Sequence, residues 1–139
     1  MIKAKTSAIS FRIPQGWHVV DANDSTFIDL WIVRDDLKVS LSLLPFHSNN
    51  KTNSLQDYFE MSLLLKKMKY SNIFSIVKEE AITLNGKETL FYNFENDKDK
   101  FRVAIFQHNN NTYELTLFGN NSNIKIEYFI QELLIITVK

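Results

Sequence analysis

Apolar and polar residues alternate along most of this chain, and short polar runs separate the alternating stretches. Such alternation is typical of β-strands, because successive side chains point to opposite faces of a sheet. The pattern predicts strands over residues 9–13, 17–20, 26–34, 38–43, 73–84, 87–95, 101–106 and 112–118. The run 26–34 is nearly continuously apolar, as expected of a strand that is covered on both faces.

Short turns join several of these predicted strands. Pro14-Gln15-Gly16 turns the chain after the first strand, and Asn85-Gly86 is a strong hairpin signal because both positions accept a positive φ. Polar runs at residues 96–99 and 109–111 predict two further turns. Because neighbouring hairpins pair adjacent strands, the pattern predicts an antiparallel sheet.

Two stretches have the period of a helix. The first begins with the Ser-x-x-acid capping sequence at residues 54–57 and extends to about Lys69. Its apolar stripe is formed by Tyr58, Met61, Leu65 and Met68, with Leu55, Phe59 and Leu63 beside it. We interpret this stripe as a helix face packed on the sheet, in preference to a cofactor pocket.

The second helix is predicted from about Asn123 to Leu134, with an extended tail over residues 135–138. Its buried stripe should consist of Ile126, Phe129, Ile130 and Leu133. Strands, a helix, four more strands and a helix predict an α+β domain with a central antiparallel sheet of six or seven strands, flanked by two helices. One domain should span residues 1–139, since no internal repeat or linker is visible.

Composition narrows the possible partners. Hydrophobic residues make up 45% of the chain, which is enough for a packed core. Sixteen basic and sixteen acidic residues give no net charge, so nucleic acid is not an expected partner. No window approaches the length of a membrane span, and the absence of cysteine excludes disulfides and thiolate metal sites.

Candidate metal ligands and catalytic residues do not occur in the sequence at the spacings that such sites require. The three histidines, His18, His47 and His108, lie far apart, and the acidic run 96–99 lacks the glycine and glutamate of a calcium loop. Asp35-Asp36 and Glu79-Glu80 are neighbours on strands, so their side chains point to opposite faces. We therefore expect no catalytic residue, no metal site and no cofactor, and hence no enzyme.

A short basic run closes the first helix at Lys66, Lys67 and Lys69. These lysines could contact an acidic partner or a membrane surface. Cations also complement the negative end of a helix dipole, so a solvated helix end explains the run equally well and is preferred.

Several predicted strands carry large apolar side chains on both faces, more than two helices are expected to cover. An uncovered apolar face would be a partner-binding or dimer surface, whereas long loops and the N-terminal segment could also cover it. Both interpretations stay open at this point. The residues expected to contact a partner are Trp31, Phe91, Phe101 and Phe106.

Four motifs give the chain a family resemblance. They are Phe11-x-Ile13-Pro14-x-Gly16-Trp17, the helix start Leu55-Gln56-Asp57-Tyr58, the Leu84-Asn85-Gly86 turn, and Thr112-Tyr113-x-Leu115-Thr116 before a final helix. Together they resemble the PsbP/Mog1-like superfamily over roughly residues 8–138. The resemblance implies a central antiparallel sheet flanked by helices. Its DcrB-like envelope lipoproteins and its Eag-type effector chaperones of type VI secretion are the bacterial branches.

This resemblance implies binding and assembly roles without chemistry. The expected function is a bacterial adaptor or chaperone that binds an apolar, transmembrane-type segment of a larger protein such as a type VI secretion effector, with a homodimer possible. It would act in the cytoplasm if Met1 is the native start. The alternative is the soluble domain of a DcrB-like envelope lipoprotein, periplasmic or lipid-anchored, whose signal peptide has been removed.

Overall fold

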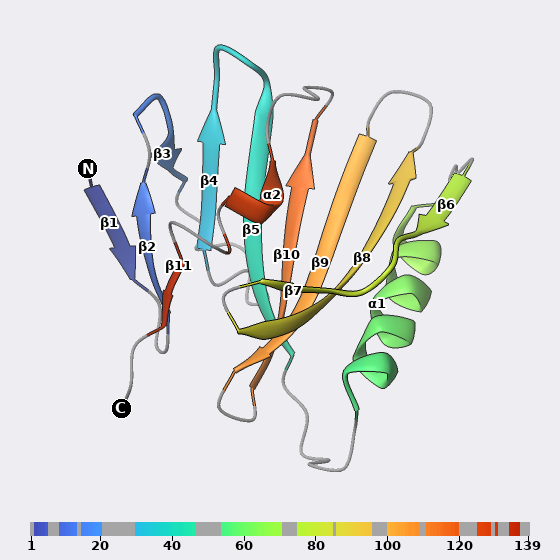
Figure 1. Ribbon diagram of the computed structural model, residues 1–139. Helices are drawn as coiled ribbons and strands as arrows, with labels where there is room; N and C mark the ends of the chain where they lie inside the picture. The colour runs from blue at the N-terminus through green and yellow to red at the C-terminus, as the bar shows by residue number, and fades with distance from the viewer. Residues whose placement is uncertain are drawn as a thin grey trace.

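Strands dominate the computed structural model of the chain, which describes residues 2–5, 9–13, 15–20, 30–46, 54–70, 75–84, 86–95, 100–108, 111–119, 125–128, 130 and 134–136. The described elements are β1 (Ile2–Lys5), β2 (Ile9–Ile13), β3 (His18–Val19), β4 (Leu30–Arg34), β5 (Val39–Phe46), α1 (Leu55–Lys69), β6 (Ser75–Lys78), β7 (Ile82–Leu84), β8 (Lys87–Glu95), β9 (Lys100–His108), β10 (Asn111–Phe118), α2 (Ile126–Tyr128) and β11 (Leu134–Ile136). Figure 1 shows them arranged around one large, twisted sheet.

The main sheet has eight strands in the order β3-β4-β5-β10-β9-β8-β6, and β7 also pairs with β8. All of these pairings are antiparallel. The α+β class, with a large antiparallel sheet and two helices, is therefore confirmed. The sheet has one strand more than the upper expectation, because β6 and β7 both pair with β8.

A second, three-stranded sheet has the order β1-β2-β11. The last strand, β11, pairs with β2, so that Leu134 lies opposite Phe11 and Ile136 opposite Ile9. The extended tail predicted after the second helix therefore begins as a paired strand. It places the last described strand in the same small sheet as the first, β1 (Figure 1).

The long strand expected over residues 73–84 is wrong in one respect, because two strands, β6 and β7, occupy its described part. Lys78 lies opposite Tyr92, but Ile82 lies opposite Thr89, so this side contains one residue more than its partner strand. Such an extra residue is a β-bulge, which bends a strand and redirects its side chains. Glu79 lies at the start of this bulge, two residues after Val77, which is paired with Asn93, and its carboxylate accepts a hydrogen bond from the Asn93 side chain.

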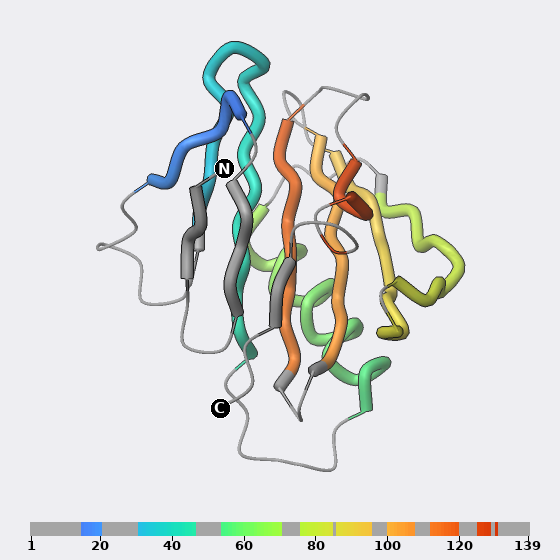
Figure 2. Tube along the Cα trace, turned by 60° about the vertical axis from the view of Figure 1, so that its left-hand side comes forward, coloured from blue at the N-terminus to red at the C-terminus, as the bar shows by residue number. Residues whose placement is uncertain are grey.

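Apolar side chains fill both faces of the main sheet. The front face in Figure 1 carries α2 and a cluster that includes Trp17, Ile32, Phe91, Phe106 and Ile126, whereas the back face carries α1. The back cluster consists of Tyr58, Phe59, Leu63, Tyr92, Phe94, Phe101, Val103 and Ile105. The two helices lie on opposite sides of the sheet, as the rotated view also shows (Figure 2).

Helix α1 begins and ends as the sequence indicates. The Ser54 hydroxyl accepts a hydrogen bond from the Asp57 backbone N–H at 3.2 Å, and the Asp57 carboxylate accepts one from the Ser54 N–H at 2.8 Å. This reciprocal capping box satisfies two backbone donors that would otherwise lack helical partners. The helix then runs for 15 residues to Lys69, which confirms the predicted limits.

Helix α2 is described only over Ile126–Tyr128. Ile126 and Ile130 are fully buried against the front of the sheet, which confirms these two members of the predicted stripe. The other two, Phe129 and Leu133, lie outside the described residues.

Candidate protein-binding surface

The four residues expected to contact a partner do not form one surface. Phe91 and Phe106 are buried in the front cluster, and Phe101 is buried in the back cluster, where its ring stacks on Phe94 at 4.3 Å. Trp31 is half-buried. Strand alternation separates the phenylalanines onto opposite faces. A contact between any of the four and a partner stays a prediction, but Trp31 alone is accessible in the described structure.

The inner face of α1 packs on the back of the sheet through aromatic and aliphatic side chains. Tyr58, Phe59 and Leu63 are buried there. The ring of Phe59 meets Tyr92 edge-on, with 5.5 Å between the ring centroids. Of the stripe that the sequence predicts for this face, Tyr58 is buried, and so are Phe59 and Leu63 beside it, whereas Met61, Leu65 and Met68 are exposed. The predicted face is therefore confirmed on the side of Phe59 and Leu63 and wrong for the other three residues.

A buried polar cluster joins the same face of α1 to the sheet. The carboxylate of Glu114 on β10 is only 2% exposed. Its Oε1 atom accepts hydrogen bonds from Ser62 Oγ and from Lys66 Nζ, both at 2.7 Å. The Tyr92 hydroxyl lies 2.6 Å from Ser62 Oγ, and because Ser62 donates to Glu114, its oxygen is left to accept from Tyr92. Burial, followed by the charge of Glu114, raises the pKa of Tyr92, so the phenol keeps its proton.

This polar cluster explains the rotation of α1 about its axis. A buried carboxylate is costly unless it is paired and hydrogen-bonded. Ser62 and Lys66 are four residues apart and lie on one side of the helix, so both reach Glu114 only if that side faces the sheet. The opposite side of α1 then faces away from the sheet.

The exposed side of α1 includes a line of apolar residues beside charged and polar ones such as Gln56, Glu60 and Lys67. The four apolar members are Met61, Leu64, Leu65 and Met68, whose exposed fractions are 39%, 58%, 48% and 73%. Their spacing of three, four and seven residues places them on one line along the helix, which we call the outer stripe. Exposed apolar residues that occur singly are ordinary, but a continuous line of them indicates an interaction surface.

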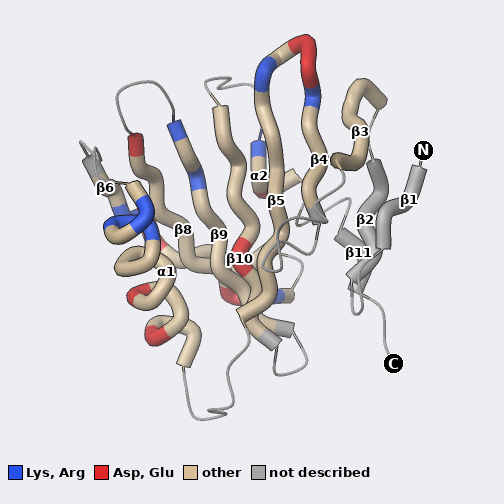
Figure 3. The backbone as a smooth tube through the Cα atoms, turned by 180° about the vertical axis from the view of Figure 1, so that it is seen from behind, with Lys and Arg blue, Asp and Glu red and all other residues tan. Residues whose placement is uncertain are grey.

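Charges border the outer stripe in an ordered way. Asp57 and Glu60 lie in the first half of α1, whereas Lys67 and Lys69 lie in the second half. Figure 3 shows this separation, with red segments at one end of the helix and blue segments at the other. Both ends match the helix dipole, which favours anions near the N-terminus and cations near the C-terminus.

A second charged cluster lies on the front face. Arg102 donates to both carboxylate oxygens of Glu79 at 2.9 Å and to Glu127, and its guanidinium lies 4.4 Å from the centre of the Phe91 ring. The hydrogen bond from Arg102 lowers the pKa of Glu79. For Glu127, burial alone would raise the pKa, but the hydrogen bond and charge of Arg102 outweigh it and lower the pKa. The cluster ties the β6–β7 bulge and α2 to β9, which is a structural role.

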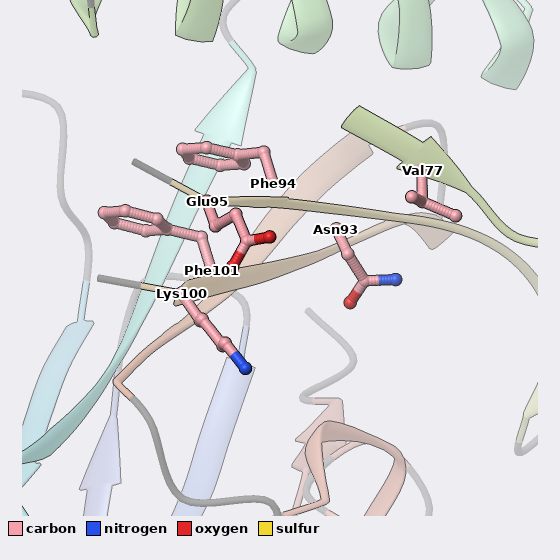
Figure 4. Close-up of a pocket in the computed structure, with 6 residues that line it drawn as sticks. All are labelled: Val77, Asn93, Phe94, Glu95, Lys100 and Phe101. Carbon is pink, nitrogen blue, oxygen red and sulfur yellow. The ribbon is translucent and has the colours of Figure 1, made fainter. Parts of the chain in front are cut away.

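A cavity of about 220 Å³ lies at the hairpin end of β8 and β9 and is lined by Val77, Asn93, Phe94, Glu95, Lys100 and Phe101. It is smaller than typical small-molecule sites of roughly 300–1,000 Å³. The stacked rings of Phe94 and Phe101 point to one side, whereas Asn93 and Lys100 point to the other (Figure 4). Because its polar groups do not converge, the cavity does not have the form of a ligand site.

Grouped metal ligands and membrane-spanning helices are not found in the described ranges. No three His, Asp or Glu side chains there are grouped closely enough to hold a metal ion. His18 is paired with Asp35 at 2.8 Å. None of the helices within these ranges combines the length and apolar character that a membrane-spanning helix requires.

The sequence contained one signal for the outer stripe that its interpretation missed. Eight of the fifteen residues of α1 are large and apolar: Leu55, Tyr58, Phe59, Met61, Leu63, Leu64, Leu65 and Met68. That is more than one face of a four-turn helix holds, so some had to point away from the sheet.

Comparison with known proteins places the fold. The sequence matches no protein-family model and no curated protein. Among solved structures, it is similar to the solution structure of cyanobacterial PsbP (CyanoP) from Synechocystis sp. PCC 6803, with a TM-score of 0.53 and 15% identity over 83% of this chain and 76% of that one. It is also similar to LpqN of Mycobacterium tuberculosis, which is involved in cell envelope biogenesis, with a TM-score of 0.52 and 12% identity over 97% of this chain and 87% of that one.

These identities are low, so the likeness concerns the fold alone. It nevertheless spans most of both chains in each comparison. It does not distinguish the DcrB-like branch from the others. The predicted resemblance is confirmed at this level: the chain has the fold of the PsbP/Mog1-like superfamily.

Proposed function

We propose that this protein is a non-enzymatic adaptor or chaperone that binds an apolar segment of a larger protein along the outer stripe of α1. The observation that carries the proposal is the exposure of Met61, Leu64, Leu65 and Met68 on a helix whose other face is already anchored to the sheet. In the described part of the chain these side chains stay exposed, and keeping them in water is unfavourable.

The chemistry of the outer stripe suits an apolar helical partner. Burying a Leu or Met side chain contributes roughly 1.5–3 kcal/mol before the costs of association. When one helix packs against another apolar helix, its contact residues are spaced at i, i+3, i+4 and i+7. Two of the four residues are methionines, whose flexible side chains adapt to partners of different shape. A transmembrane-type segment of a secreted effector, of type VI secretion or a similar system, is the client class we propose.

The solved structures of similar fold give general support. One is a cyanobacterial PsbP and the other is involved in cell envelope biogenesis. We propose the cytoplasm as the compartment. The alternative, a domain of an envelope lipoprotein, rests on the likeness to LpqN, a protein involved in cell envelope biogenesis, over 97% of this chain. An upstream apolar segment ending in a cysteine, found in the gene, would establish that alternative and exclude the cytoplasmic one.

The test is comparative purification of the native-length protein from its own host. Wild type should recover one larger polypeptide with an apolar helical segment in stoichiometric amount, and Leu64→Ser/Met68→Ser should lose it. Ile82→Ser is the matched control, because Ile82 is also exposed and apolar but lies on β7. Equal recovery by the wild type and the double variant would overturn the proposal.

A further inference from the structure

The outer stripe and the charges that border it are self-complementary, so this surface can pack against the same surface of a second copy of the chain. We infer that, without a client, a second copy of this chain covers the outer stripe, with the two α1 helices packed antiparallel about a two-fold axis. The inference concerns the free protein. Its consequence, that self-association and client binding compete for one surface, rests on the proposed function.

The apolar positions are self-complementary in this arrangement. A two-fold axis between Leu64 and Leu65 places Leu64 of one copy opposite Leu65 of the other, and Met61 opposite Met68. Each copy contributes the same surface, as a two-fold interface requires. A short side chain then meets a short one and a long side chain meets a long one, which allows the helices to pack along the whole stripe.

The bordering charges select the antiparallel direction. Glu60 and Lys67 are seven residues apart, so they lie on the same side of the outer stripe, one in each half of α1. Antiparallel pairing places Glu60 of each copy beside Lys67 of the other. Parallel two-fold pairing would place the flanking residues of the two copies on opposite sides of the interface, so the attraction between Glu60 and Lys67 would be lost. The dipoles of two antiparallel helices also oppose each other favourably.

The size of the contact sets its strength. A helix of 15 residues is about 22 Å long, and four apolar residues per copy bury less than the roughly 1,200 Å² of a stable interface. The dimer should therefore be weak and exchange rapidly. Such a dimer shields the outer stripe from non-specific contacts while leaving it available to a client that binds more tightly.

Cysteine pairing tests the geometry directly, because the chain has no cysteine of its own. A disulfide forms only where two Cα atoms come within about 4.4–6.8 Å. We expect Met61→Cys and Met68→Cys to form little disulfide dimer when each is oxidised alone, and to form the mixed dimer when the two are combined. Ile82→Cys, at an exposed position on β7, should not cross-link with either.

The outcomes of this test separate the possibilities. Efficient cross-linking of Met61→Cys with itself would show a parallel pair and overturn the inference. The same holds if the mixture yields no more dimer than the Ile82→Cys control. In either case client recovery by the wild type would be unaffected, so failure of this inference and failure of the proposed function can be told apart.

Charge reversal is a second test of the antiparallel arrangement. Glu60→Lys and Lys67→Glu should each weaken the dimer about tenfold or more in sedimentation equilibrium, since each places two like-charged pairs at the contact. An equimolar mixture of the two variants should restore association, because every pair is then of opposite charge. Circular dichroism checks that both variants are folded. Wild type that is monomeric at all concentrations would overturn the inference.

Discussion

The two faces of helix α1 have similar apolar content but different partners. The inner face, with Tyr58, Phe59 and Leu63, is buried on the sheet, whereas Leu64 and Met68 of the outer stripe are more than half exposed. The difference arises from a polar contact. The hydrophobic effect is not directional, so either face could have been buried by it alone. The Glu114 carboxylate accepts from specific atoms and thereby selects one rotation.

The largest effect on stability should come from Lys66→Met, which leaves the buried Glu114 carboxylate without its cation. Removing one partner of a buried ion pair costs about 3–5 kcal/mol. Chemical denaturation should therefore show a large loss of unfolding free energy. Lys67→Met is the matched control, because Lys67 is exposed on the same helix, and it should change stability by less than about 0.5 kcal/mol.

Replacing both partners refines this prediction. In Lys66→Met/Glu114→Met no buried charge remains, and apolar replacement of a buried pair is often neutral or stabilising. The double variant should recover most of the stability lost by Lys66→Met. If the double variant is as unstable as the single one, the Glu114 cluster does not determine how α1 packs.

A smaller loss of unfolding free energy is expected from Ser62→Ala. This change removes one donor to Glu114 and the acceptor for the Tyr92 hydroxyl, while Lys66 remains in place. A buried polar group left unsatisfied costs about 1–3 kcal/mol, and urea unfolding should show a loss in this range. Gln56→Ala, on the exposed side of α1, should be close to wild type. Equal stability of the two variants would contradict the inner-face assignment.

The charged cluster on the front of the sheet should contribute less to stability, and its contribution should depend on pH. Glu79 and Glu127 have lowered pKa values because of Arg102, so the stability they add is present above their unfolded pKa of about 4.5. It is lost as the pH falls through the lower folded pKa values. Arg102→Met should cost about 1 kcal/mol at pH 7, because all three groups are partly exposed. It should also reduce the decline of stability below pH 4.5, and an unchanged profile would contradict this account.

The smallest effect on stability belongs to the outer stripe. Leu64→Ser/Met68→Ser removes two apolar side chains that are already largely in water, so its unfolding free energy should lie within about 0.5 kcal/mol of the wild type. Thermal unfolding at low protein concentration is the measurement, because there the dimer adds nothing. A loss of several kcal/mol would show that these residues belong to the core.

Local patterns in the sequence were sufficient for the main sheet, but not for the second sheet with its first strand β1, nor for the surface. Alternation located the strands of the main sheet, and the Ser54 capping box located the start of α1. The β-bulge between Lys78 and Ile82 could not be predicted, because it depends on which residues of β8 lie opposite.

The orientation of α1 depends on contacts between residues far apart in the sequence. Thr112, Glu114 and Thr116 alternate with apolar residues, which is typical of a strand face in water. The structure instead covers Glu114 with Ser62 and Lys66, which precede it by about fifty residues. Helical spacing alone does not reveal that contact, and the outer stripe follows from it.

Site-specific photocross-linking in the native host tests most directly whether the outer stripe is a binding surface. A photoreactive amino acid at position 68 replaces the most exposed member of the stripe, and the same amino acid at Glu88, exposed on β8, is the control. We expect position 68 to cross-link to an apolar segment of one larger protein, or to a second copy of this chain when that protein is absent. If position 68 yields no more adduct than position 88, the outer stripe is not a binding surface.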